Sequence, residues 1–354
     1  QVSGTDVEAA AVQLTGNLLH DGAREAALVR VLVGSDALAD RWRAEPASWA
    51  GAAQGTPVAP IAGRIAVALG RAAADFDAVA RFRFERATGK PLRALVDAVQ
   101  ARSRSGARLE ARPSLDLARS RWWQMPAGRG QLALSGGGLP TLRVAAVPSG
   151  PGQPLRATVR VEPYAAGAAR IALAPVAVSL DGRGWRAETR VDLNGPLGDG
   201  SVQGVTVPVR VSGTGGTLAL NPGCTPVTWR RLAVGGLAID PATLRLCAPG
   251  AALLTVVNGR VGGVARIDAA RLTGHLGGSP LALAWAGART DLGRPGFALA
   301  GVTVRLGQSE RETRLDMAEL DGALSDGEVA GRFNGAGGQI GAVPLDLSQA
   351  EGVW

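Results

Sequence analysis

Apolar and polar residues alternate along most of this chain, and this alternation is what most limits how it can fold. In residues 155–162, leucine, alanine and valine occupy every second position, with Arg156, Arg160 and Glu162 among the residues between them. The same pattern recurs in residues 186–193, 205–211, 281–285 and 302–306. Successive side chains of a β-strand point to opposite faces, so a period of two predicts strands with one apolar and one polar face.

Glycine-rich turn signals separate these runs. Asx-Gly pairs favour two-residue hairpin turns, because such turns need backbone conformations that these residues tolerate. Such pairs occur at Asp181-Gly182, Asn194-Gly195, Asn258-Gly259, Asp321-Gly322, Asp326-Gly327 and Asn334-Gly335. The sequence therefore predicts a mainly β protein, built as a long antiparallel meander.

The apolar face of such a meander has to be covered, because a flat apolar sheet in water would aggregate. Either a second sheet packs on it, or the sheet curls around an apolar ligand. Aromatic residues make up only 4% of the chain, so walls of alanine, valine and leucine would leave a wide gap unfilled. A sheet curled into an open groove and a closed two-sheet sandwich both remain compatible with this composition. The candidate groove-lining residues are Val159, Val161, Val191, Leu193, Val207, Val209, Leu283 and Trp285.

The N-terminal third of the chain is expected to be mixed. Apolar residues at spacings of four, four and three predict an amphipathic helix near residues 61–74. A second short helix is expected over Ser35–Arg43, where Ser35 would provide the N-cap. The sequence thus suggests a mixed region at residues 1–120 and a sheet region at residues 121–354, without a sharp linker between them.

The formal net charge is +8, and Lys90 is the only lysine. The arginines alternate along strands instead of clustering with aromatic residues, which argues against a nucleic-acid partner. Attraction to anionic lipid surfaces is compatible with this charge, but a solvated, arginine-rich sheet face is the simpler interpretation. The Trp122-Trp123 pair is either an interface anchor or packing at the start of the sheet.

Catalytic and metal-binding patterns are not found in the sequence. His20 and His275 are far apart in the chain, and the carboxylates of residues 310–316 lack the aromatic platforms of a sugar site. Nucleotide-binding loops and nucleophile elbows do not occur. Residues 250–257 form one of the more apolar stretches, too short to cross a membrane as a helix. The sequence predicts no enzyme, no metal site and no cofactor.

Asn221–Pro249 reads NPGCTPVTWRRLAVGGLAIDPATLRLCAP, with a Cys-x-Pro-Val opening and a Leu-Cys-x-Pro close. This segment resembles a passage of the YdbH-like family of large AsmA-like envelope proteins. Gly331–Trp354, and the helix at Pro60–Ala74 together with Gly128–Leu142, are similar to other passages of that family. The resemblance implies a periplasmic segment of a protein that is anchored in the inner membrane of a Gram-negative bacterium.

The resemblance also implies a function. Members of the family are taken to move phospholipid between the inner and outer membranes along a curled sheet with an apolar groove. We therefore expect phospholipid as the ligand, membrane contact through parts outside this segment, and a small outer-membrane lipoprotein as a partner. The rival hypotheses are a structural or adhesin-like β-protein with a closed core, and an assembly factor that binds β-strands at a free sheet edge.

Cys224 and Cys247 are the two cysteines of the chain. Their spacing fits no zinc motif, which would need four ligands. In the oxidising compartment that the resemblance implies, a single disulfide between them is expected. Two buried free thiols are the alternative.

Overall fold

The computed structural model describes most of the chain. The described residues are 13–21, 24–34, 46–51, 53–87, 93–113, 115–116, 130–147, 154–257, 260–292, 296–308, 311–325 and 328–353. The helix expected at Ser35–Arg43 and the Trp122-Trp123 pair lie outside these residues.

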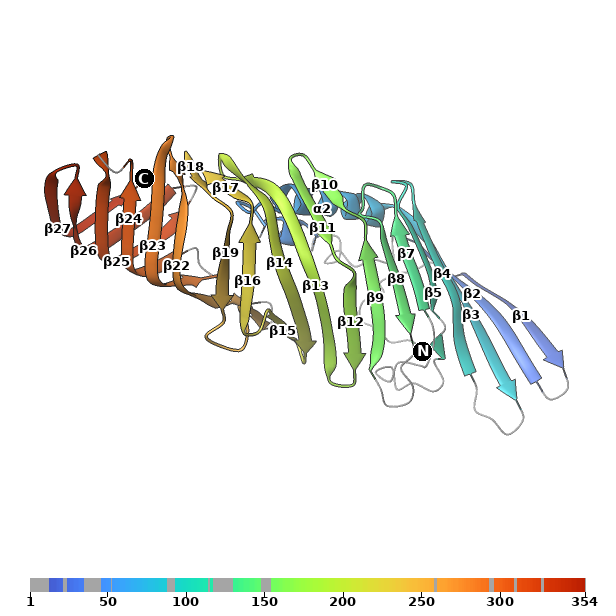
Figure 1. Ribbon diagram of the computed structural model, residues 1–354. Coiled ribbons are helices and arrows are strands. Elements are labelled where there is room, and N and C mark those ends of the chain that lie inside the picture. Colours follow the sequence, from blue (N-terminus) through green and yellow to red (C-terminus); the bar gives the residue numbers. More distant parts are fainter. Residues whose placement is uncertain are drawn as a thin grey trace. The chain divides into compact units, whose positions relative to one another are not determined.

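The protein is mainly β, as the sequence predicts, and its strands pair antiparallel (Figure 1). The contacts divide the chain into two compact units: residues 1–54 with 58–187 (unit 1), and residues 55–57 with 188–354 (unit 2). This division differs from the one expected near residue 120. Strand pairing explains the difference, because β5 (Arg108–Pro113) is hydrogen-bonded to β7 (Gly130–Ser135) across that point of the sequence.

Unit 1 is a meander of short strands. Its other strands are β1 Gln13–Asp21, β2 Arg24–Gly34, β3 Phe76–Ala87, β4 Arg93–Ser103, β6 Leu115–Asp116, β8 Leu142–Val147, β9 Leu155–Val161, β10 Tyr164–Ala166, β11 Ala169–Leu173 and β12 Val176–Asp181. Most neighbours along the chain are also neighbours in the sheet, while β9 pairs with β12 beyond the β10–β11 hairpin. The boundary between the two units falls within strand β13, Gly184–Leu197.

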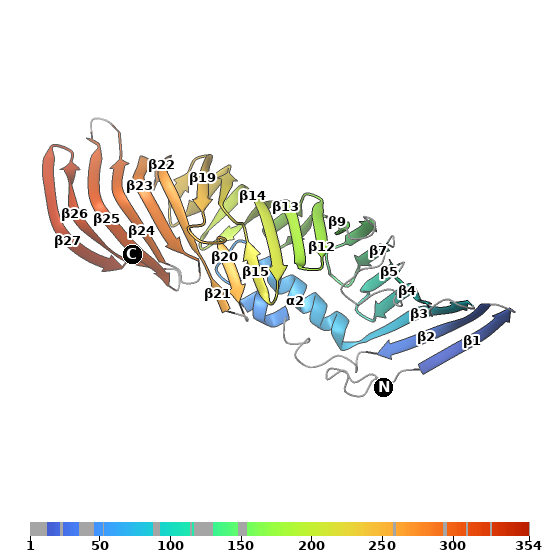
Figure 2. The same ribbon diagram turned by 90° about the horizontal axis from the view of Figure 1, so that it is seen from below.

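The predicted amphipathic helix is present as α2, Ala59–Ala74, and begins two residues earlier than expected. Figure 2 shows its axis crossing the direction of strands such as β12. Its buried residues are Ile61, which packs with residues of β10 and β11, and Ala68, which packs with residues of β7 and of the turns after β4 and β7. The Arg64 guanidinium donates a 2.8 Å hydrogen bond to the Ala165 carbonyl oxygen and lies 5.5 Å from the centre of the Tyr164 ring. Burial of the apolar stripe, more than helix propensity, fixes such a helix in place.

Unit 2 contains a forked sheet followed by a long meander. Its remaining strands are β14 Gly200–Thr214, β15 Thr217–Leu220, β16 Cys224–Trp229, β17 Arg231–Val234, β18 Leu237–Ile239, β19 Ala242–Cys247, β20 Leu254–Val257, β21 Arg260–Gly262, β22 Val264–Leu276, β23 Ser279–Asp291, β24 Gly296–Leu306, β25 Thr313–Ser325, β26 Glu328–Ile340 and β27 Val343–Val353. One end of β14 pairs with β15, and the rest pairs with β16 and β17.

Asn221 holds the fork together. It is buried and has a left-handed backbone conformation, with φ of 50°, which asparagine tolerates better than most residues. Its side-chain oxygen accepts a 2.7 Å hydrogen bond from the Arg210 N–H, and its amide donates one of 3.0 Å to the Pro208 carbonyl oxygen. Both polar ends of the buried amide are thereby satisfied.

Strands β22 to β27 share a crease at mid-length, where they bend (Figure 1). Their regular pairing is interrupted at Ala269 and Ala286, then at Gly301, Ala318 and Gly335. Gly301 and Gly335 have φ values of 60° and 58°, in the left-handed region that favours glycine. At the crease the unpaired residues of neighbouring strands lie opposite each other, so the register is kept while the side chains beyond the crease change face. The apolar series Val302, Val304 and Leu306 therefore continues on the same face through Leu299 and Phe297.

Three of the predicted hairpin turns lie inside strands, and those predictions were wrong. Asn194-Gly195 is within β13, Asp321-Gly322 within β25, and Asn334-Gly335 within β26. Close approach explains two of the glycines: a methyl group at Gly195 would collide with the Pro57 carbonyl, and one at Gly322 with the Phe297 ring. Gly335 lies at the crease, where its backbone is in the left-handed conformation.

Substituting Gly301 with alanine is expected to destabilise unit 2. The left-handed conformation costs a non-glycine residue about 1–2 kcal/mol, and the new methyl would lie 3.0 Å from Ala286 Cβ. The matched control is Gly287→Ala, because Gly287 has open space around the position of a methyl and no left-handed backbone. Denaturant unfolding of both variants measures the difference, and equal free energies would contradict the proposed role of Gly301.

Candidate functional site

One face of strands β22 to β26 carries no charged residue over its described length. Cross-strand register places the same-face residues in continuous rows. They are Ala265, Ile267, Ala270, Leu272, Gly274, Leu281, Leu283, Trp285, Ala288, Thr290, Phe297, Leu299, Val302, Val304, Leu306, Thr313, Leu315, Met317, Leu320, Gly322, Gly331, Phe333, Ala336, Gly338 and Ile340. We call this set the apolar face.

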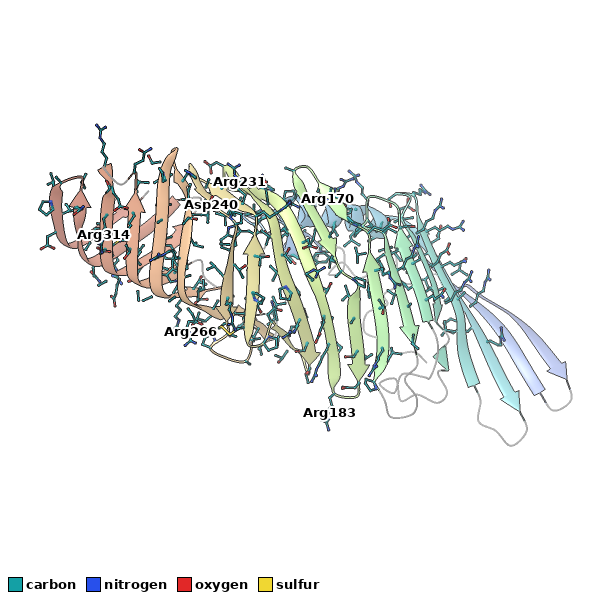
Figure 3. All side chains as sticks on the ribbon, in the orientation of Figure 1. Arg170, Arg183, Arg231, Asp240, Arg266 and Arg314 are labelled. Atoms are coloured by element: carbon teal, nitrogen blue, oxygen red, sulfur yellow. A yellow bond between two sulfur atoms is a disulfide. The ribbon has the colours of Figure 1, made fainter. Side chains whose placement is uncertain are left out.

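The opposite face of the same strands, the polar face, carries the charges. Figure 3 shows Arg266 and Arg314 among its side chains. Its charged positions in the described part of these strands include Arg266, Asp268, Arg271, Arg289, Arg305, Arg314, Asp316, Glu319, Asp321 and Arg332. The separation of the two faces is thus complete over five strands, although the crease interrupts the alternation in each strand.

Several of the most buried residues on the apolar face lie beside the crease. Val302 and Ala336 are each 1% exposed, and Met317 and Trp285 are nearly as buried. The Trp285 indole N–H donates a 3.2 Å hydrogen bond to the Asp268 carbonyl oxygen, so its one polar group is satisfied. Away from the crease, residues such as Leu283, Val304 and Leu315 are half-buried and pack around this cluster. The bend therefore makes a dry cluster at its centre and leaves a partly open apolar surface around it.

Unit 1 has an apolar face of its own. Register aligns one row across seven strands: Ala80, Val99, Ala111, Leu132, Val144, Val159 and Val176. The side chains of this row are half-buried, and none of them belongs to the two apolar clusters around helix α2. A further row ends in Leu134, Leu142 and Val161.

The predicted groove residues occupy apolar positions of both units. Val159 and Val161 lie in the rows of unit 1, and the other six residues lie in unit 2. Val191, Leu193, Val207 and Val209 are half-buried on β13 and β14, and Leu283 is half-buried on β23, whereas Trp285 is buried in the cluster at the crease. Sequence reasoning missed Leu299, Leu320 and Phe333 as members of the apolar face. Gly301 and Gly335 were the available signals, since both interrupt strand patterns.

Charge pairs on the polar face are well exposed. Arg314 Nε lies 2.7 Å from Asp316 Oδ2, and the Thr303 hydroxyl donates a 2.8 Å hydrogen bond to Asp316 Oδ1. Partial burial raises the pKa of Asp316, but the hydrogen bonds from Thr303 and Arg314 and the positive charges of Arg314 and Arg305 outweigh it. The pKa of this carboxyl is therefore lower than its ordinary value.

Asp316 should stabilise the fold at neutral pH and lose this effect in acid. Its pKa is lower in the folded than in the unfolded state, so its contribution is present above the unfolded pKa of about 4 and is lost as the pH falls through the folded pKa. The pair is exposed to solvent, which limits the effect to about 1 kcal/mol or less. Unfolding free energies of the wild type and Asp316→Asn at pH 7 and pH 2 are the measurement. A difference that is the same at both pH values would contradict this assignment.

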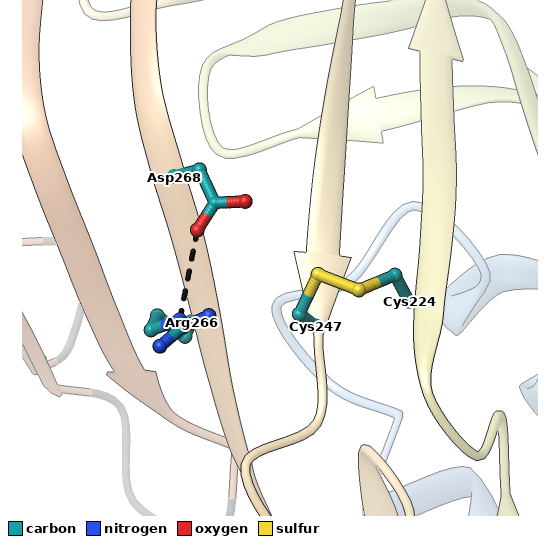
Figure 4. The surroundings of a disulfide bond; sticks show 4 residues. All are labelled: Cys224, Cys247, Arg266 and Asp268. Carbon is teal, nitrogen blue, oxygen red and sulfur yellow. Dashed lines mark ion pairs between the residues drawn. A yellow bond between two sulfur atoms is a disulfide. The ribbon is translucent and has the colours of Figure 1, made fainter.

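The two cysteines form a disulfide between neighbouring strands. Cys224 on β16 is directly opposite Cys247 on β19, and the two sulfur atoms are 2.00 Å apart. Cys247 is also in register with Arg266 of β22, whose guanidinium lies 3.6 Å from Asp268 (Figure 4). The disulfide thus joins β16 and β19 beside the first strand of the long meander.

Thiol titration of the denatured, unreduced protein should find no free thiol. Closing a loop with a sequence separation of 23 residues stabilises a fold by roughly 3 kcal/mol in the chain-entropy model, so reduction should lower the unfolding free energy by a similar amount. Reduced protein, with two thiols per chain, is the control for the titration. Two reactive thiols before reduction would rule out the disulfide.

Within the described residues, no group of three or more histidine, cysteine, aspartate or glutamate side chains is placed to hold a metal ion. No helix among them is long and apolar enough to cross a membrane. Comparison with protein-family models, curated proteins and solved structures found no match for the chain.

Proposed function

We propose that this protein is a segment of a periplasmic bridge that transfers phospholipid between the inner and outer membranes, and so contributes to lipid homeostasis of the outer membrane. The uncharged face of β22 to β26 carries this proposal. Acyl chains would lie against that face and against the apolar rows of unit 1, while the headgroups stay in water. No chemical step is required.

The energetics favour such binding. Each methylene group removed from water contributes about 0.8 kcal/mol, so partial burial of two acyl chains offsets much of the cost of leaving a bilayer. Valine, leucine and alanine form most of the face, and no charged residue interrupts it over the described length. A smooth wall of this kind allows lipid to slide along it rather than holding it in one deep pocket.

The burial at the crease supports a second candidate, a structural protein with a closed core. Trp285, Val302, Met317 and Ala336 are buried to the degree of core residues in ordinary proteins. In a closed structural protein, the half-buried residues around them would be the rim of a small core and would bind no ligand.

Lipid extraction from the purified native protein separates the two candidates. We expect mass spectrometry to find phospholipid in a fixed ratio to protein, and the protein to transfer labelled phospholipid between vesicles. A β-rich protein purified in the same way is the control for lipid carried over from membranes. Protein that is free of lipid and inactive in transfer would favour the closed structural protein.

A further inference from the structure

The polar face of unit 2 contains a shallow cleft with a volume of ≈ 430 Å³. Its floor includes Gly287, Ala298 and Ala300, which are cross-strand neighbours on β23 and β24. These residues have at most a methyl side chain, so a gap opens between the longer side chains of β22 and β23 and those of β25. The cleft lies on the side of the sheet opposite the apolar face.

One wall of the cleft is basic. Arg266 and Arg289 line it and are directly opposite each other on β22 and β23. Like charges in this arrangement destabilise a sheet. Arg266 is 3.6 Å from Asp268, but within the described part of the chain Arg289 has no carboxylate at ion-pair distance. An anion between the two guanidinium groups would relieve their repulsion.

The other wall is acidic. Glu319 and Asp321 line it from β25, which is two strands from Arg289. Asp321 Oδ2 lies 4.0 Å from Arg332 Nε, whereas no ion pair of Glu319 is found among the described residues. Strands lie about 4.8 Å apart, so the backbones of β23 and β25 are separated by roughly 10 Å. The cleft volume of ≈ 430 Å³ leaves room for a small molecule between the two walls.

We propose that this cleft binds a small zwitterion, a phosphate ester with a primary amine. The phosphate would be held by Arg266 and Arg289, because guanidinium groups form paired hydrogen bonds with phosphate oxygens. The ammonium group would be held by Glu319 and Asp321. This site is independent of the proposed lipid transfer, since it uses the other face of the sheet.

Calorimetric titration of the whole chain with phosphoethanolamine tests the proposal. We expect saturable binding of one molecule per chain. Inorganic phosphate and ethanolamine can each interact with only one wall of the cleft, so each should bind at least tenfold more weakly than phosphoethanolamine. Equal binding of phosphate and phosphoethanolamine would overturn the two-walled site, and so would a lack of any binding.

Matched variants assign the binding to the cleft. Arg289→Gln and Glu319→Gln should each weaken binding at least tenfold, while Arg305→Gln should leave it unchanged. Arg305 is an exposed arginine of the same face, directly opposite Arg314 and outside the cleft. Unfolding curves show whether each variant is folded. If folded Arg289→Gln binds like the wild type, or if Arg305→Gln loses binding equally, the proposed site is wrong.

The same variants distinguish a free ligand from a lipid headgroup. Binding of the protein to vesicles that contain phosphatidylethanolamine is compared with its binding to vesicles of phosphatidylcholine alone. The quaternary amine of phosphatidylcholine cannot donate a hydrogen bond. A preference for phosphatidylethanolamine that Arg289→Gln abolishes would identify the headgroup as a ligand of the cleft. If soluble phosphoethanolamine binds but the vesicles show no preference, the ligand is a free zwitterion.

Discussion

Leu283→Asp is expected to abolish the proposed contact with lipid while leaving the protein folded. Leu283 is half-buried on the apolar face, so water can reach a carboxylate at its edge and limit the loss of stability. A charge that faces hydrocarbon costs several kcal/mol unless it is paired, which corresponds to a loss of at least a hundredfold in lipid transfer. Val207→Asp on β14 should behave in the same way.

Transfer of labelled phospholipid between vesicles and thermal unfolding are the two measurements. The matched control is Ala282→Asp, which places the same charge one residue away on the polar face. A photoreactive residue at position 283, but not at 282, should crosslink to lipid. If Leu283→Asp unfolds the protein and no crosslink forms at either position, the face belongs to a closed core and not to a lipid path.

Trp285→Ala is expected to lower the free energy of unfolding by about 3–5 kcal/mol, the usual cost of removing a buried aromatic side chain. Trp285 is 7% exposed in the cluster beside the crease, and it satisfies the Asp268 carbonyl with a hydrogen bond. Its loss leaves both a cavity and an unpaired carbonyl at the point where the strands bend.

Trp49→Ala is the control for this variant, because Trp49 is 44% exposed and its removal should cost about 1 kcal/mol or less. Denaturant titration gives both values. If Trp285→Ala is as stable as Trp49→Ala, the crease does not depend on a packed cluster, and the side chain would be free to line an open surface.

The sequence alone determined the class of fold and the two-faced character of the strands. Alternation in residues 186–193 and 281–285 predicted β13 and β23, and the spacing of apolar residues predicted helix α2. These signals are local: a period of two or of 3.6 can be read within ten residues. The two cysteines could be proposed as a disulfide pair because the chain has no other cysteine.

The tertiary structure decided which residues share a face. The left-handed glycines Gly301 and Gly335 change the face of every residue beyond them, so Leu299 and Phe333 join Val302 although a strict period of two would place them on the other side. In the sequence, a glycine that forms a turn cannot be distinguished from one that forms a crease or one that leaves space for a neighbouring side chain, as Gly322 does for Phe297.

The cleft between Arg289 and Glu319 also depends on pairing between strands. These residues are 30 positions apart in the sequence, and the register of β23, β24 and β25 brings them to the same cleft. Long-range register depends on contacts over the whole sheet, and no local pattern encodes it.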